Sequence, residues 1–291
     1  MATVTPADIA SWPAPNYDHP HTRIPILAGL EIPFAIIMTA FVATRFYGRA
    51  CITKILGADD WVMLAAWAFT LSQSLNNLAG IPYGNARHLW DVRPETVPTA
   101  MKLALVAQAL FPPAAALTKI SVCMTYLRIF PSKLNRYFCY VAIGYEVCWG
   151  IASFFGGIFM CIPVSTYWDV TSPHGSCIDE KAFLMATAAL NNVSDFLIFL
   201  WPARFLWQVQ LPTKQRLGLI AMFAMGSLVC IAGVCRIWYF TVYFASYDAF
   251  WEGSIIYSIL AVETDLGVIF GCLPGCKPVV AACFPVVFGT S

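Results

Sequence analysis

The stretch LGADDWVMLAAWAFTLSQSL, residues 56–75, indicates the start of a long helix, because it places two carboxylates, Asp59 and Asp60, at the beginning of an apolar run. Gly57 ends a short loop, so both acids occupy the first turn of a helix, where unpaired N–H groups and the helix dipole favour anions. The candidate ion-pair partners are Arg45, Arg49 and Lys54. We interpret the pair as a helix cap held by these partners; the alternative is a direct chemical role.

Apolar runs of this kind recur seven times in a chain of 291 residues that is 59% hydrophobic and 11% charged. One soluble core cannot bury so much apolar surface. Each run is long enough to cross the ~30 Å hydrocarbon layer of a bilayer as a helix. The expected spans lie near residues 26–46, 58–79, 101–128, 138–161, 183–205, 216–243 and 254–274. The sequence therefore predicts an all-α, polytopic membrane protein with a seven-transmembrane helix bundle, in the endoplasmic reticulum or the plasma membrane.

Basic residues are unevenly distributed around these spans, with ten on one side and five on the other. Cytoplasmic loops retain Lys and Arg, so we expect the N-terminus outside or in the lumen and the C-terminus in the cytosol. Three segments follow: a polar N-terminus (1–25), a seven-helix membrane domain (26–280) and a short cytosolic tail (281–291). No cleavable signal is visible in residues 1–23. The net charge of +1 indicates no nucleic-acid partner.

Several short motifs occur in a specific order along the chain. They are the GADDW entry at residues 57–61, YGNARHLWDV at 83–92, LTKISVCMTYLRIF at 117–130, CIPVSTYWDV at 161–170 and VETDLGVIFGCLPGCKPVV at 262–280, with Cys177, Asp195, Pro202 and Arg236 between the last two. This set resembles the fungal rhodopsin-domain family of seven-helix membrane proteins over about residues 30–280. That family includes satratoxin-cluster-type proteins and Pth-type receptor-like proteins, so the resemblance implies either secondary-metabolite biosynthesis or reception of a cue.

A retinal protein needs a lysine in its seventh helix to form the Schiff base. The expected helix 254–274 contains none, since Lys277 lies beyond Pro274 and Lys119 belongs to the third helix. A photoreceptor is therefore not expected, and no cofactor is predicted. Neither is a metal site, because His88 has no second histidine or cysteine at ligand spacing.

Ionisable side chains inside the spans are costly and therefore functional candidates. Lys119 and Asp195 lie roughly 13 Å from the cytosolic interface, at a depth where they could pair, and Glu146 reaches a similar level. Glu263 and Asp265 lie near mid-depth but point about 200° apart. One lysine cannot neutralise four acids, so at least one carboxyl group is expected to be protonated. The alternative is an interhelical polar network that fixes packing.

The candidate catalytic residues are Asp195, Glu146, Glu263 and Asp265, and the candidate binding residues are Lys119, Asn191, Arg236, His88 and Trp168. Arg236 is expected near the outer surface, where it reaches into the interface or holds an anion, with Glu31 as a possible partner. His88 and Trp168 are expected in a polar cluster that rims an outer entrance. Cys161 and Cys177 flank an outer loop in an oxidising setting, which predicts a disulfide between them.

Two functional hypotheses follow. In the first, the protein takes part in fungal secondary metabolism as a membrane-bound cyclase without a redox cofactor. A protonated Asp195 or Glu146 would protonate an alkene or epoxide of a terpenoid or prenylated substrate, aromatic rings would stabilise the cation, and a second carboxylate would take the last proton. In the second, it is a Pth-type receptor that senses a surface or lipid cue and couples to a G protein, with Arg128 at the cytosolic end of the third helix. A proton-coupled transporter ranks third.

Overall fold

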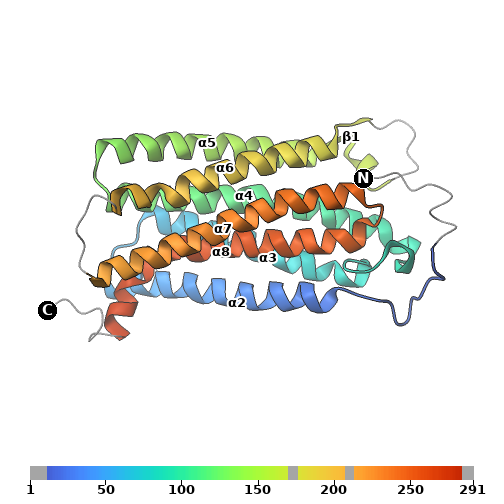
Figure 1. Cartoon of the computed structure of the whole chain (residues 1–291), viewed down its shortest axis with the longest axis horizontal. Helices are drawn as coiled ribbons and strands as arrows, with labels where there is room; N and C mark the ends of the chain where they lie inside the picture. Colours follow the sequence, from blue (N-terminus) through green and yellow to red (C-terminus); the bar gives the residue numbers. More distant parts are fainter. Residues whose placement is uncertain (1–11, 170–175, 207–212, 284–291) are drawn as a thin grey trace.

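The computed structural model of the chain describes residues 12–169, 176–206 and 213–283. Within them, long helices lie side by side in an elongated bundle (Figure 1). They are α2 (Ile24–Tyr47), α3 (Ala58–Ala79), α4 (Val97–Ile129), α5 (Lys133–Ile158), α6 (Glu180–Leu206), α7 (Thr213–Ala245) and α8 (Ala249–Cys283). Each expected span falls on one of these helices. α3 has the bounds expected for it and α5 ends three residues early, whereas the other helices extend beyond their spans because the hydropathy pattern fades in the polar turns at their ends.

Six stretches of the described residues are long and apolar enough to cross a membrane. They lie in every long helix except α3, whose second half carries amides and hydroxyls. Gln73, Ser74 and Asn77 of that half are at most 2% exposed, so its polar face is turned into the bundle. The hydropathy of α3 is low because of this buried polar face, whereas its opposite face carries Trp61 and Leu75, which are 60% and 58% exposed.

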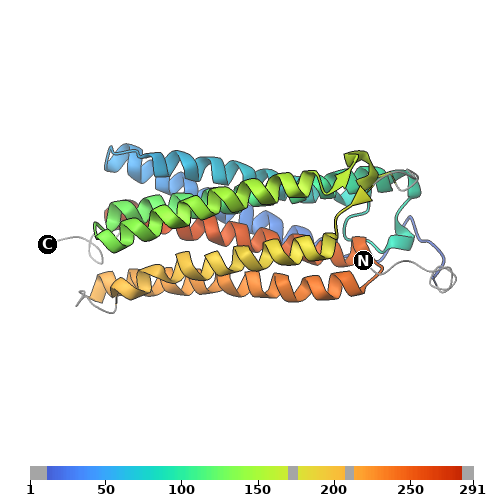
Figure 2. The ribbon, with the colours of Figure 1, turned by 90° about the horizontal axis from the view of Figure 1, so that it is seen from above.

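The helices pack mostly against chain neighbours, with α3 on α4, α4 on α5, α6 on α7 and α7 on α8. In addition, α8 packs on α2 and closes the bundle, and it also contacts α3 and α4 (Figure 2). Its apolar window is 67% buried, the largest share among the six apolar stretches. Acidic residues on α8 therefore face protein and not lipid.

The loops gather at the two ends of the bundle. One end, which we call the hairpin end, carries β1 (Cys161–Ile162) paired with β2 (Ser176–Cys177), and the expected Cys161–Cys177 disulfide joins the two strands. The short helices at this end are η2 (Ile81–Tyr83), η3 (Leu89–Asp91), η4 (Pro94–Thr96) and η5 (Val164–Tyr167). The π-helix η1 (Gly48–Ile52) follows α2 at the opposite end.

Candidate functional site

A cluster of charged side chains lies inside the bundle and is centred on Lys119 of α4, which is 2% exposed. Its Nζ lies 2.9 Å from Asp195 Oδ1 of α6 and 3.6 Å from Glu146 Oε1 of α5. Nζ also donates hydrogen bonds to the side-chain oxygen of Asn191 at 2.8 Å and to Ser194 Oγ at 2.7 Å. The lysine therefore ties α4 to α5 and α6 through ionic contacts that a bilayer would not screen.

Asn191 extends the cluster to α8, because its Nδ2 donates to Asp195 Oδ2 and to Glu263 Oε1, both at 3.0 Å. Glu263 Oε1 in turn lies 3.2 Å from Arg236 Nη1 of α7. We call this set the buried charge cluster: Lys119, Glu146, Asn191, Asp195, Arg236 and Glu263. It contains two cations and three carboxyl groups, so the described partners neutralise at most two of the acids.

The expectation that Arg236 lies near the surface is wrong. The residue is 1% exposed, its guanidinium carbon lies 4.7 Å above the centre of the Phe111 ring, and its ionic partner is Glu263 rather than Glu31. Glu31 instead accepts a hydrogen bond from Asn77 Nδ2 at 2.7 Å. Distance along a helix gives the depth of Arg236, about nine residues from the end of α7, but not the direction of its side chain.

Asp265 lies outside the buried charge cluster. Neither of its carboxyl oxygens has a hydrogen-bond partner among the described residues, although the side chain is fully buried. The divergence of Glu263 and Asp265 follows from their spacing, since residues two apart on a helix face nearly opposite sides. The four candidate acids therefore do not form one site.

A cavity opens between α4, α5, α6, α7 and α8 in the half of the bundle nearest the hairpin end, and its empty space amounts to about 830 Å³, open solvent included. Its lining is mostly apolar and aromatic, with Phe111, Trp149, Phe183 and Phe240 among the rings. We call it the hairpin-end cavity. Arg236 lines it, so the buried charge cluster adjoins it.

A second cavity lies beside it and extends toward α3, and five residues line both spaces. Four of these are Glu180, Tyr167, Tyr243 and Tyr257, so one acid and three phenols stand where the cavities meet. Burial raises the pKa of Tyr167, which lies in η5 outside the membrane-spanning helices. Tyr167 therefore stays a neutral phenol able to donate a hydrogen bond.

The four candidate catalytic residues lie away from this space. Asp195, Glu263 and Lys119 line only a narrow gap that is separate from the hairpin-end cavity. Glu146 and Asp265 line none of the described cavities. The structure therefore brings Asp195, Glu146, Glu263 and Lys119 together, but around each other and not around an open space.

His88 and Trp168 lie in the loops of the hairpin end and line neither larger cavity. The His88 ring stacks on Trp251 at 3.7 Å and on Trp90 at 4.5 Å, and its Nδ1 lies 2.6 Å from Asp248 Oδ2. The centre of the Trp168 ring lies 5.4 Å from Lys102 Nζ. These contacts join the loops to α8 and α4, so both residues help to close this end of the bundle. The described residues contain no cluster of potential metal ligands.

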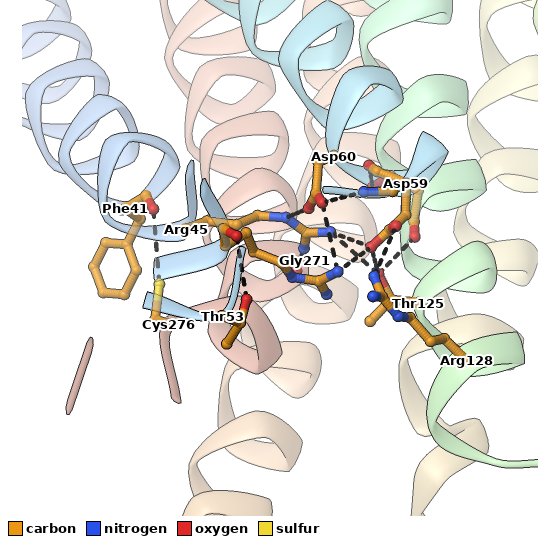
Figure 3. A network of polar contacts seen from close by, with 12 residues as sticks. Phe41, Arg45, Thr53, Asp59, Asp60, Thr125, Arg128, Gly271 and Cys276 are labelled. Atoms are coloured by element: carbon orange, nitrogen blue, oxygen red, sulfur yellow. Dashed lines mark hydrogen bonds and ion pairs between the residues drawn. The ribbon is translucent and has the colours of Figure 1, made fainter. Parts of the chain in front are cut away.

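The two acids of the opening stretch form a second ionic cluster at the opposite end (Figure 3). Arg45 of α2 is 0% exposed; its Nη2 donates to Asp59 Oδ2 at 2.7 Å and its Nε to Asp60 Oδ1 at 2.8 Å. Asp60 Oδ2 also accepts the backbone N–H of Gly57 at 3.0 Å, which caps α3. The prediction of a cap with ionic partners is confirmed for Arg45 and Arg49; the latter lies 3.2 Å from Asp59.

Two other helices join this group, which we call the Arg45 cluster: Arg45, Arg49, Asp59, Asp60 and Arg128. Arg45 Nη1 donates to the Gly271 carbonyl of α8 at 2.7 Å, and Arg128 at the end of α4 lies 3.6 Å from Asp59 Oδ1 (Figure 3). Arg45 is buried, whereas the Arg128 side chain is 41% exposed. The cluster therefore holds α2, α3 and α8 together and leaves one arginine accessible at the surface.

Sequence reasoning missed Glu180, the tyrosines beside it and Gln108. The expected span began at residue 183, which left Glu180 in a loop, whereas α6 begins at Glu180. An acid in the first turn was a usable signal for an earlier start. No local pattern pointed to Tyr167, Tyr243 or Gln108, because they meet only when η5, α7 and α4 pack together.

Comparisons with known proteins agree with this architecture. The family model described as Fungal rhodopsin domain matches residues 44–282. A SAT4 family membrane protein of Emericella nidulans is 34% identical over 158 residues, which cover 53% of this chain and 41% of that protein. The Polyenoic acids biosynthesis gene cluster protein Ba17b of Metarhizium anisopliae is 27% identical over 217 residues, 71% of this chain and 57% of its own length. The Receptor GIN3 of Arthrobotrys oligospora is 22% identical over 225 residues, 75% of this chain and 54% of that receptor.

Further relatives are named after the fugralin, wortmanamide and satratoxin biosynthesis clusters. This chain spans about half the length of the first relatives it matches. No solved structure matches it. Its apolar helices and its matches define the class: this is an integral membrane protein. Within that class the chain belongs to the fungal rhodopsin domain family, which confirms the resemblance of its motifs.

Proposed function

We propose that this protein acts in fungal secondary-metabolite biosynthesis by binding a lipophilic intermediate in the hairpin-end cavity. The observation that carries this proposal is the cavity itself, with its aromatic walls and few polar groups. Small-molecule sites commonly have this composition. The cluster names of several relatives support a biosynthetic role over a purely structural one.

The reaction we propose is an acid–base cyclisation of the bound molecule. Since Asp195 and Glu146 contact Lys119 and do not line the cavity, Glu180 is the acid placed against the substrate. Its carboxyl group would donate a proton to an alkene or epoxide, the rings of Phe183 and Phe240 would face the resulting cation, and the Glu180 carboxylate would take back a proton at the end. In this proposal the buried charge cluster holds the helices that shape the cavity.

The experiment replaces the chromosomal gene with variants and compares metabolite extracts by mass spectrometry. Gly253 lines the cavity, and a Cβ built on it would lie 3.8 Å from the Tyr243 and Tyr257 rings, so Gly253→Phe fills the space without a backbone clash. We expect it to accumulate the same precursor as a deletion strain. Gly144→Phe is the control, because Gly144 is exposed and has nothing within 4 Å of an added Cβ. An unchanged metabolite profile in the deletion strain refutes the biosynthetic role.

Glu180→Gln tests the reaction apart from binding. We expect loss of product with the precursor still bound, whereas Asp195→Asn should affect product only as far as it lowers the amount of folded protein. Equal product from Glu180→Gln and wild type rules out Glu180 as the acid.

The second candidate function is that of a receptor, and the Arg45 cluster favours it. An accessible arginine, Arg128, lies at the end of α4 and is joined through Asp59 to α3, so movement of either helix would change its exposure. The match to Receptor GIN3 supports this reading. Arg128→Gln should then abolish a G-protein response while ligand binding in the cavity stays intact. Under the biosynthetic proposal the same variant leaves the product unchanged.

We further propose that α3 is a seventh span, with its polar face turned into the bundle, and that the hairpin end faces the lumen or the exterior, where its disulfide would persist. Residues 26–280 then form the membrane domain between the N-terminal segment (1–25) and a cytosolic tail (281–291). Residues 1–11 and 284–291 lie outside the described part of the chain. A protease-accessible C-terminal tag in sealed microsomes would support this orientation, and a protected tag would exclude it.

A further inference from the structure

The inner end of the hairpin-end cavity presents hydrogen-bond donors that have no acceptor among the described residues. Arg236 lines the cavity and uses only Nη1 for Glu263, while its Nε and Nη2 are buried with no hydrogen-bond partner among the described residues. Gln108 of α4 also lines the cavity, and its Nε2 is likewise buried without a partner in the described chain. Buried N–H groups without acceptors are costly, so each calls for an explanation.

These donors lie deep in the cavity. Arg236 is nine residues from the end of α7, which places it roughly 13 Å below that helix end. Its guanidinium carbon lies 4.7 Å above the centre of the Phe111 ring and its Nη1 is engaged by Glu263, so Nε and Nη2 are the groups left to meet a ligand. A ligand that fills the apolar part of the cavity would therefore reach these donors with one end.

The chemistry of the donors defines the end of the ligand. Only a hydrogen-bond acceptor, such as an oxygen atom, can satisfy them, because Arg236 offers donors alone and the free group of Gln108 is its NH₂. The charge of that oxygen follows from the neighbourhood. The buried charge cluster already holds three carboxyl groups against two cations, so a further carboxylate would add unbalanced negative charge beside Glu263.

We propose that the hairpin-end cavity recognises a neutral carbonyl oxygen, such as that of a ketone or ester, through Arg236 and Gln108 at its inner end. This rests on the proposed function and narrows its substrate class from any lipophilic molecule to one with an apolar body and a carbonyl group. Glu180, at the other end of the cavity, would face the opposite part of the same molecule.

The test uses the full chain in lipid nanodiscs with tritiated 2-tridecanone as the probe and empty nanodiscs as the partition control. Unlabelled 2-tridecanone, methyl dodecanoate, dodecanoate and tridecane serve as competitors. We expect the ketone and the ester to compete at about tenfold lower concentration than tridecane, because they satisfy the buried donors. Dodecanoate should compete less well than its methyl ester.

Two variants remove the donors by different routes. Gln108→Met keeps the volume and breaks no ion pair, and Arg236→Lys keeps a cation for Glu263 but loses the N–H fork. Each should erase most of the preference for the ketone over tridecane. Arg87→Lys is the matched control, because Arg87 Nε is also buried without a partner in the described residues but lines neither cavity.

The outcomes separate this inference from the proposed function. Equal competition by tridecane and 2-tridecanone, with saturable binding that Gly253→Phe abolishes, overturns the carbonyl assignment and leaves lipophilic binding in place. Stronger competition by dodecanoate than by its ester overturns the charge argument. Retention no greater than in empty nanodiscs overturns the proposed binding function itself.

Discussion

Replacing Lys119 with methionine tests whether the buried charge cluster consists of ions. The Nζ of Lys119 lies within 4 Å of two carboxyl groups and donates three hydrogen bonds, two to Asn191 and one to Ser194. Lys119→Met would leave Asp195 with only Asn191 as a described donor. Removing one partner of a buried ion pair costs about 3–5 kcal/mol, mostly from the charge left behind. We expect a loss of this size in the free energy of unfolding.

The double variant Lys119→Met, Asp195→Asn removes the abandoned charge as well and should recover roughly 2 kcal/mol of that loss. The assay is unfolding in mixed micelles by titration with sodium dodecyl sulfate, followed by tryptophan fluorescence. Lys102→Met, which removes only a contact with the Trp168 ring, serves as the control and should cost below about 1 kcal/mol. A Lys119→Met loss no larger than the control, or a double variant no more stable than the single one, would show that no ionic pair exists there.

Two further predictions concern the ends of the bundle. Cys161→Ser opens a loop of sequence separation 16 and should lower the free energy of unfolding by about 3 kcal/mol. Reducing agent should then no longer change the stability of the variant. A persisting effect of reducing agent would contradict the Cys161–Cys177 pairing. Gly275→Ala puts a methyl group 2.7 Å from Arg45 Cγ and should lower the free energy of unfolding by about 1–3 kcal/mol. Gly29→Ala is the control and should not lower it, because nothing lies within 4 Å of the added methyl group. Equal melting temperatures for the two variants would disprove the close approach of α8 to α2.

The sequence was sufficient for features that depend on local pattern. Hydropathy located each helix, because a run of about 20 apolar residues has few alternatives to a membrane helix. The Asp59–Asp60 pair was correctly interpreted as a cap with arginine partners, since Arg45 in the last turn of α2 and the first turn of α3 flank one short connection. Cys161 and Cys177 could be paired because they flank the same loop.

The candidate site was only partly predictable. Depth along the helix brought Lys119 to the level of Asp195, and the structure joins them at 2.9 Å. Depth along the helix did not predict the direction in which the Arg236 side chain points, and in the structure it turns inward to Glu263. Glu180 escaped notice because an acid at a helix start is ordinary, and only packing makes it part of a cavity wall.

The amino-acid sequence alone was enough to predict that the chain resides in a membrane as a set of long helices, and it located most of the charges that lie within them. These properties depend on the transfer free energy of each side chain and on the periodicity of apolar residues. Both can be read from residues that are close together in the chain. Tertiary packing sets which of those charges meet and where a cavity remains. Those outcomes depend on how each helix is rotated about its axis, and the rotation is set by packing between residues far apart in sequence.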